Sequence, residues 1–197
     1  MPAAQQAIGA DHHAASRARG RRAISSCAHG SWDNSSCDRP TTVLGGVDTA
    51  DYIARLYQAF ASAPRPAQGE VTPHRCDECD EVSARLSRHA ARHVPHEDML
   101  WLGDSMPLLS PKAFRYYLPR FIEFCLVAPE SSAEALINYN LAPSGDLDVG
   151  ERNRFAHFAD AERRVVLEFV EYRVALPDSE FDRKYLEDAR AFWSVAA

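Results

Sequence analysis

The chain has 197 residues, a length that suits one domain of about 150 residues with an appendage. Its net charge of −6 is uneven: residues 1–46 carry five Arg and three acids, whereas residues 47–197 carry 17 basic and 25 acidic residues. The acidic main part argues against nucleic acid as a partner, because phosphate-backbone binding needs clustered positive charge. No stretch approaches the ~18 consecutive apolar residues of a membrane span, so we expect no membrane partner either.

The cysteine content and the first residues indicate a cytoplasmic protein. The five cysteines are irregularly spaced, unlike the disulfide framework of a secreted domain. The chain starts MPAAQQAIGADHHAASRARGRR, which lacks the apolar core of a secretory signal. Arginine outnumbers lysine 20 to 2, a bias that we attribute to a GC-rich bacterial genome.

Residues 1–46 are rich in Ala, Ser, Arg and Gly and have almost no periodic apolar residues. Such a segment buries too little surface to offset its ordering entropy, so we expect a disordered N-terminal extension. A mis-assigned translation start, with the true start near Val43 or Val47, is a further hypothesis. The domain itself is expected over residues 47–197.

Helical periodicity begins directly after this extension. Apolar residues spaced as on one helix face, with Thr49 as the expected N-cap and Pro64 as a stop, predict a first helix over about 49–60. A second helix is expected from about Arg75 to Arg92. A short third helix should run from His96 to Leu102 and end at Gly103.

The clearest start signal of the chain is Leu109-Ser110-Pro111, where Ser110 caps a helix and Pro111 occupies its first position. Aromatic and apolar residues follow on one side, and Pro119 should kink this helix. A capping box beginning at Ser131 predicts a short helix through about Tyr139.

Two further helices complete the pattern. Asp160 is expected to cap a helix that ends at Pro177, and Ser179 should begin the last one. No segment alternates with period two, so no strand is expected. The sequence predicts an all-α protein, a single compact bundle of about seven helices.

Two blocks of the sequence resemble a family of uncharacterised bacterial proteins of about 150 residues. The first block is Cys76-Asp77-Glu78-Cys79-Asp80-Glu81-Val82, and the second is the central Leu-Leu-Ser-Pro-x-Ala-Phe-Arg-Tyr-Tyr-Leu-Pro segment, residues 108–119. The similarity continues in Phe155-Ala156-His157-Phe158 and spans about residues 70–176. It implies a small helical protein and brings no catalytic residue.

The stretch HRCDECDEV, residues 74–82, offers the strongest candidate site. His74, Cys76 and Cys79 supply three borderline or soft ligands in six residues, a pattern that suits one tetrahedral zinc ion. His89 and His93 cannot complete the set if residues 75–92 form one helix, since His93 would then lie about 25 Å from Cys76. His96, Cys125 or His157 would have to return through the fold.

Two other interpretations of the same stretch stay open. A helical stripe is formed by Cys76, Cys79, Val82 or Ser83, Leu86 and Ala90, and free cysteine often packs as a small apolar residue, which is the interpretation that we favour. A redox pair ranks behind zinc, because four carboxylates within five residues oppose a thiolate.

The remaining motifs do not point to an enzyme. Gly103-Asp104-Ser105 resembles a lipase block but precedes a capped helix and has no matching His motif, so we interpret Asp104 and Ser105 as turn residues. Arg115, between Phe114 and Tyr116, could pair with a buried carboxylate. The leading functional hypothesis is a non-enzymatic module that binds a protein partner and has no cofactor. The alternative is a zinc-binding or thiol-dependent protein that uses His74, Cys76 and Cys79.

Overall fold

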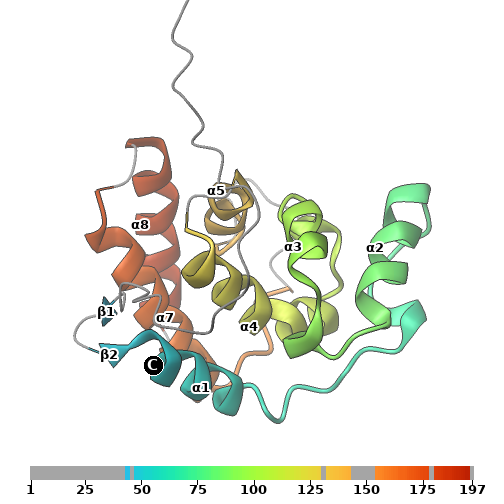
Figure 1. Cartoon of the computed structure of the whole chain (residues 1–197), viewed down its shortest axis with the longest axis horizontal. Coiled ribbons are helices and arrows are strands. Elements are labelled where there is room, and N and C mark those ends of the chain that lie inside the picture. The colour runs from blue at the N-terminus through green and yellow to red at the C-terminus, as the bar shows by residue number, and fades with distance from the viewer. Residues whose placement is uncertain (1–42, 45–46, 130–131, 143–153, 178–179, 196–197) are drawn as a thin grey trace, which may run out of the picture. The chain divides into compact units, whose positions relative to one another are not determined.

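The computed structural model describes residues 43–44, 47–129, 132–142, 154–177 and 180–195. Seven α-helices make up this part of the chain, together with three short 3-10 helices (Figure 1). The helices are α1 (Thr49–Ala59), α2 (Asp77–Ser87), α3 (His96–Leu102), α4 (Pro111–Val127), α5 (Ser132–Tyr139), α7 (Asp160–Ala175) and α8 (Glu180–Ser194). The all-α prediction is confirmed. The predicted disorder of residues 1–46 falls almost wholly outside the described residues, as do Ser131 and Ser179.

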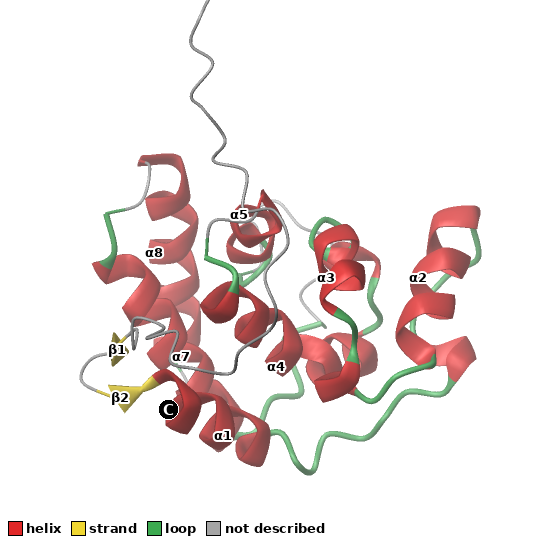
Figure 2. Cartoon of the chain, in the orientation of Figure 1, coloured by secondary structure: helices red, strands yellow, loops and turns green. Residues whose placement is uncertain are grey.

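The β structure in the described part is limited to one two-residue pair. β1 (Val43–Leu44) and β2 (Val47–Asp48) are antiparallel, with Leu44 opposite Val47, and lie directly before α1 (Figure 2). The sequence did not predict these strands, because two residues are too few to show an alternating pattern.

The long helix α4 forms the centre of the fold. Ser110 caps it as predicted, since its side chain accepts a hydrogen bond from the Ala113 N–H at 3.2 Å, and Pro111 occupies the first turn. Eleven of its seventeen residues are buried, and α1, α3 and α5 pack against it. The helix continues through Pro119, where the expected kink stays a prediction.

An aromatic cluster joins α4 to the C-terminal helices. The Phe114 ring lies edge-on to the Phe155 ring at 5.2 Å, and Phe158 lies edge-on to Trp193 at 5.1 Å. These edge-to-face pairs match the charge distribution of aromatic rings and bury large apolar surfaces. The Trp193 indole also donates to the Leu141 carbonyl at 2.6 Å, which holds α8 against the end of α5.

Buried polar interactions connect α1 and α4 with α7. The Tyr52 hydroxyl of α1 donates to the Val165 carbonyl of α7 at 2.6 Å. Arg115 of α4 donates from Nε and Nη2 to the fully buried carboxylate of Glu162 on α7, at 2.9–3.0 Å, so the predicted buried partner of Arg115 is Glu162. Paired in this way, the two charges satisfy each other inside the fold.

Three predicted boundaries were wrong. Asp48 caps α1 in place of Thr49, its carboxylate accepting from the Ala50 N–H at 2.6 Å. α7 begins at Asp160 with Ala159 as the capping position, where the Glu162 carboxylate accepts the Ala159 N–H at 2.8 Å. In both cases an acidic side chain accepts a backbone N–H at the start of the helix, and the cap lies one residue before the predicted position.

The third boundary concerns α2, which ends at Ser87 and not near Arg92. The Tyr117 hydroxyl donates to the Leu86 carbonyl at 2.8 Å, and Arg65 donates to the Ser87 carbonyl at 2.7 Å. Side chains from other segments therefore satisfy the carbonyls at the helix end, a tertiary effect that local periodicity cannot reveal. A separate 3-10 turn follows at Ala91–His93.

None of the described helices combines the length and the apolar character needed to cross a bilayer.

Candidate metal centre

Cys76 is the N-cap of α2, and this position explains its conformation. Its backbone is extended, and its Sγ accepts a hydrogen bond from the Cys79 N–H at 3.3 Å. Asp77, Glu78 and Asp80 occupy the first turn, where their charges complement the helix dipole. The CxxC spacing therefore places both sulfurs at the start of one helix.

The two cysteines differ in burial, which corrects the predicted apolar stripe. Cys79, Val82, Ser83 and Leu86 face the interior, whereas Cys76 is exposed. A cap residue projects from the end of a helix and not from its buried side. Cys76 thus does not pack as an apolar residue.

His74 places a nitrogen beside both sulfurs. Its Nε2 lies 3.3 Å from the Cys79 Sγ and 3.9 Å from the Cys76 Sγ, and the three ligand atoms all lie within 4.8 Å of one another. In a tetrahedral zinc site the bonds are about 2.3 Å to sulfur and about 2.0–2.1 Å to nitrogen. A sulfur ligand and a nitrogen ligand of the same ion therefore lie about 3.5 Å apart. The two nitrogen–sulfur distances, 3.3 Å and 3.9 Å, lie on either side of that separation.

Hydroxyl groups fix the backbone on which His74 lies. The Thr72 Oγ1 lies 3.1 Å from the Ser83 Oγ of α2 and donates to the His74 carbonyl at 3.4 Å. Ser83 is buried, so this pair attaches the loop to the inner face of α2. No sequence pattern pointed to Thr72 or Ser83, because their pairing depends on how the loop folds back.

The same loop is anchored to the start of α4. The Ser110 N–H donates to the Val71 carbonyl at 2.9 Å, and the Ser110 hydroxyl donates to the Glu70 carbonyl. The Lys112 ammonium pairs with the Glu70 carboxylate at 2.6 Å. The loop over residues 70–74 thus connects the CxxC block with the Ser110-Pro111-Lys112 block.

The two thiols have different chemical environments. Burial, followed by the hydrogen bond and the charge of Cys76, raises the pKa of the Cys79 thiol to about 11. At neutral pH Cys79 therefore holds its proton in the metal-free protein. Because zinc binds the thiolate, metal binding at this cluster would release that proton.

The other predicted ligands lie away from this cluster. Among the described residues, His74, Cys76 and Cys79 are the one group of three or more potential ligands that meet. The His96 ring packs on Phe124 at 4.8 Å, and Cys125 is buried within α4. His157 lines a different pocket together with Lys112 and Arg115.

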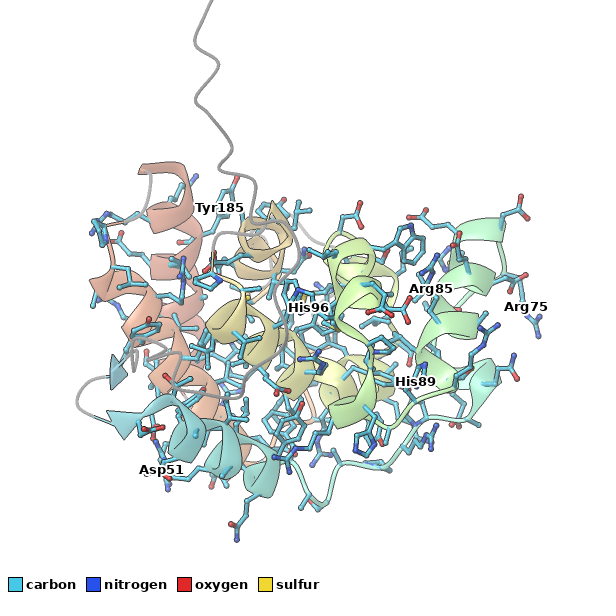
Figure 3. All side chains as sticks on the ribbon, in the orientation of Figure 1. Asp51, Arg75, Arg85, His89, His96 and Tyr185 are labelled. Atoms are coloured by element: carbon cyan, nitrogen blue, oxygen red, sulfur yellow. The ribbon has the colours of Figure 1, made fainter. Side chains whose placement is uncertain are left out.

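A polar pocket of about 440 Å³ opens next to His74. Thr72, Arg75, Asp80 and Ser83 contribute to its wall. Arg75 is 87% exposed and lies 3.9 Å from Asp80, and Figure 3 shows its side chain pointing outward beside α2. A second pocket of about 540 Å³ shares Thr72 and Pro73 with the first and continues toward Lys112.

The predicted turn residues Asp104 and Ser105 lie between α3 and the next 3-10 helix. The Ser105 N–H donates to the Leu102 carbonyl at 3.0 Å, and the buried Ser105 hydroxyl lies 3.5 Å from the Asp104 carboxylate. No histidine takes part in these interactions among the residues that the structure describes, so the pair has no triad around it.

Comparison with known proteins places the chain in a family without assigning it an activity. No curated protein and no solved structure matches it. The resemblance to an uncharacterised family is confirmed, and the matched segment includes both the CxxC block and the Ser110-Pro111-Lys112 block. Over residues 48–197 the chain belongs to a family of unknown function, DUF6714.

Proposed function

We propose that this protein binds one zinc ion through His74 Nε2, Cys76 Sγ and Cys79 Sγ. The supporting observation is the position of one imidazole nitrogen 3.3 Å and 3.9 Å from the two sulfurs. Two thiolates and an imidazole favour zinc over magnesium or calcium, which prefer oxygen ligands. The ion would join the 70–74 loop to the first turn of α2.

Binding of this kind requires reduced cysteines. We therefore infer a reducing compartment, in agreement with the cytoplasmic location expected from the sequence. A protein partner, also expected from the sequence, stays a proposal that zinc binding neither requires nor opposes.

Elemental analysis of protein purified under reducing conditions tests the proposal. Cys27 and Cys37 lie outside the described residues and are thiols that also attract zinc, so all samples carry Cys27→Ser and Cys37→Ser. We expect one zinc per chain in this background. We expect no stoichiometric zinc after Cys76→Ser, which changes an exposed side chain and leaves the core intact.

His93→Ala is the matched control. His93 is an exposed histidine outside the three-ligand group, so its replacement should leave one zinc per chain. Zinc-free protein that folds normally, or zinc retained after Cys76→Ser, would overturn the proposal.

A further inference from the structure

The backbone of the CxxC block already has the spacing that a disulfide requires. The Cys76 carbonyl accepts the Asp80 N–H at 2.9 Å, so the first turn of α2 encloses both cysteines. In helical geometry the Cα atoms of residues three apart are about 5 Å from each other. A disulfide needs a Cα separation of about 4.4–6.8 Å. Cys76 and Cys79 can therefore be joined without moving the helix.

The two free thiols differ in their access to solvent. Cys76 is exposed, whereas Cys79 is fully buried. An oxidant from solution therefore reaches the Cys76 sulfur first. The Cys79 sulfur lies within 4.8 Å of it, on the inner side. An exposed thiol beside a second cysteine that can resolve it is the arrangement of a redox-sensing pair.

Zinc changes the condition that opposes thiol chemistry in the metal-free chain. The carboxylates around the CxxC block disfavour a thiolate, although Glu81 is paired with Arg85 at 2.8 Å and Asp80 lies 3.9 Å from Arg75. A thiol that coordinates a metal ion is bound as the thiolate, which is the form that oxidants attack. The metal site and the redox pair are thus two states of the same residues.

We propose that the site is a redox switch, in which a hydroperoxide joins Cys76 and Cys79 as a disulfide and releases the zinc ion. This inference rests on the proposed zinc binding. Zinc binds thiolates and not a disulfide, so oxidation leaves His74 as the single ligand of the group. Disulfides of proteins in reducing compartments are usually transient and redox-sensing, which is the role that this pair would have.

The reaction balances with a hydroperoxide as the oxidant. The Cys76 thiolate attacks one oxygen of hydrogen peroxide, the O–O bond breaks, and Cys76 becomes a sulfenic acid while hydroxide leaves. The Cys79 thiolate then attacks the Cys76 sulfur, the S–S bond forms, and a second hydroxide leaves. Two protons from solvent convert the hydroxides to water. The two thiolates have lost two electrons, and the peroxide has gained them.

Zinc release and protein mass test the switch on the full chain with Cys27→Ser and Cys37→Ser. Hydrogen peroxide in small excess is added to the zinc-loaded protein, and a chromogenic chelator measures the zinc set free. We expect one zinc ion released per chain, and a metal-free chain about 2 Da lighter than the reduced chain, because two thiol hydrogens are lost. Treatment with dithiothreitol, its removal and added zinc should restore one bound zinc per chain.

Two variants locate the reaction. Cys125→Ser is the matched control, since Cys125 is buried in α4 and lies outside the three-ligand group. It should release zinc and lose the same mass as the parent protein. In Cys79→Ser the Cys76 thiol has no partner, so peroxide should add oxygen to the chain and remove no hydrogens.

The outcomes separate the two proposals. A parent protein that holds no zinc before peroxide is added overturns the proposed function and the switch with it. Bound zinc that peroxide does not release, or zinc released with added oxygen in place of the lost hydrogens, overturns the switch alone. A mass loss of about 2 Da that persists in Cys79→Ser places the disulfide elsewhere and also overturns the switch.

Discussion

α4 and α2 depend on different interactions for their place in the molecule. Eleven of seventeen residues are buried in α4, but only four of eleven are buried in α2. Figures 1 and 3 show α4 among the other helices and α2 at the edge beyond α3. Burial of apolar surface therefore dominates around α4, and specific polar links contribute more around α2.

Side-chain interactions hold α2 against α3 and against the preceding loop. Arg85 pairs with Asp98 of α3 at 2.7 Å and lies over the Trp101 ring at 4.5 Å, and Figure 3 shows its side chain between α2 and α3. Thr72 and Ser83 attach the preceding loop. We therefore expect metal binding at the proposed site to affect the edge of the fold more than its centre.

The largest effect is expected at the centre. Phe114→Ala should reduce the free energy of unfolding by about 3–5 kcal/mol, because it leaves a cavity in the aromatic cluster. Val127→Ala is the matched control in the same helix, since Val127 is 50% exposed and its replacement should change stability by about 0.5 kcal/mol or less. Urea denaturation measures both. Equal midpoints for the two variants would show that α4 is not the core helix.

The buried ion pair should give the next largest effect. Glu162→Gln removes the charge that faces Arg115 and should cost about 3 kcal/mol, at the lower end for a buried pair because the Arg115 side chain keeps 21% exposure.

Glu168→Gln is the control for this pair. Glu168 lies in the same helix and pairs with Arg55, but both side chains are well exposed, so the cost should stay below about 1 kcal/mol. Thermal denaturation measures the stability of both variants. An equal loss of stability in Glu168→Gln and Glu162→Gln would contradict the assigned roles.

At the edge, the hydroxyl pair should affect metal binding more than folding. Thr72→Val removes the contacts to Ser83 and to the His74 carbonyl, and should weaken zinc binding about tenfold, the lower end for groups that orient a ligand. Thr72→Ser keeps the hydroxyl and should bind like the parent. Competition with a chromogenic chelator measures both, and parent-like affinity for Thr72→Val would remove Thr72 as a positioning residue.

The last effect is absent at neutral pH and appears only in alkaline solution. Burial raises the pKa of Tyr117 from 10.0 to about 12, so the folded state keeps this proton after the unfolded state has lost it. The resulting stability is complete below pH 10 and is lost as the pH rises toward 12. Tyr117→Phe should therefore flatten the decline in stability measured between pH 10 and 12. If stability falls as steeply with pH in Tyr117→Phe as in the parent protein, the Tyr117 hydroxyl is exposed to water and not buried.

Apolar periodicity predicted the helices but not the details that build the site. It located α1, α3, α4 and α7, because each buries one face against the core. It could not distinguish Cys76 as a cap from Cys76 as a packed residue, since both fit the same spacing. His74 could be predicted as a candidate ligand because it is close in sequence to Cys76 and Cys79. The contacts of Thr72 with Ser83 and of Tyr117 with Leu86 could not be predicted, because they depend on the tertiary fold.

X-ray absorption at the zinc edge tests the central claim most directly, on zinc-loaded protein with Cys27→Ser and Cys37→Ser. We expect two sulfur neighbours at about 2.3 Å and at least one imidazole nitrogen at about 2.0–2.1 Å, with one sulfur lost after Cys76→Ser. A shell of oxygen atoms alone, or a spectrum that Cys76→Ser leaves unchanged, would contradict a zinc site at His74, Cys76 and Cys79.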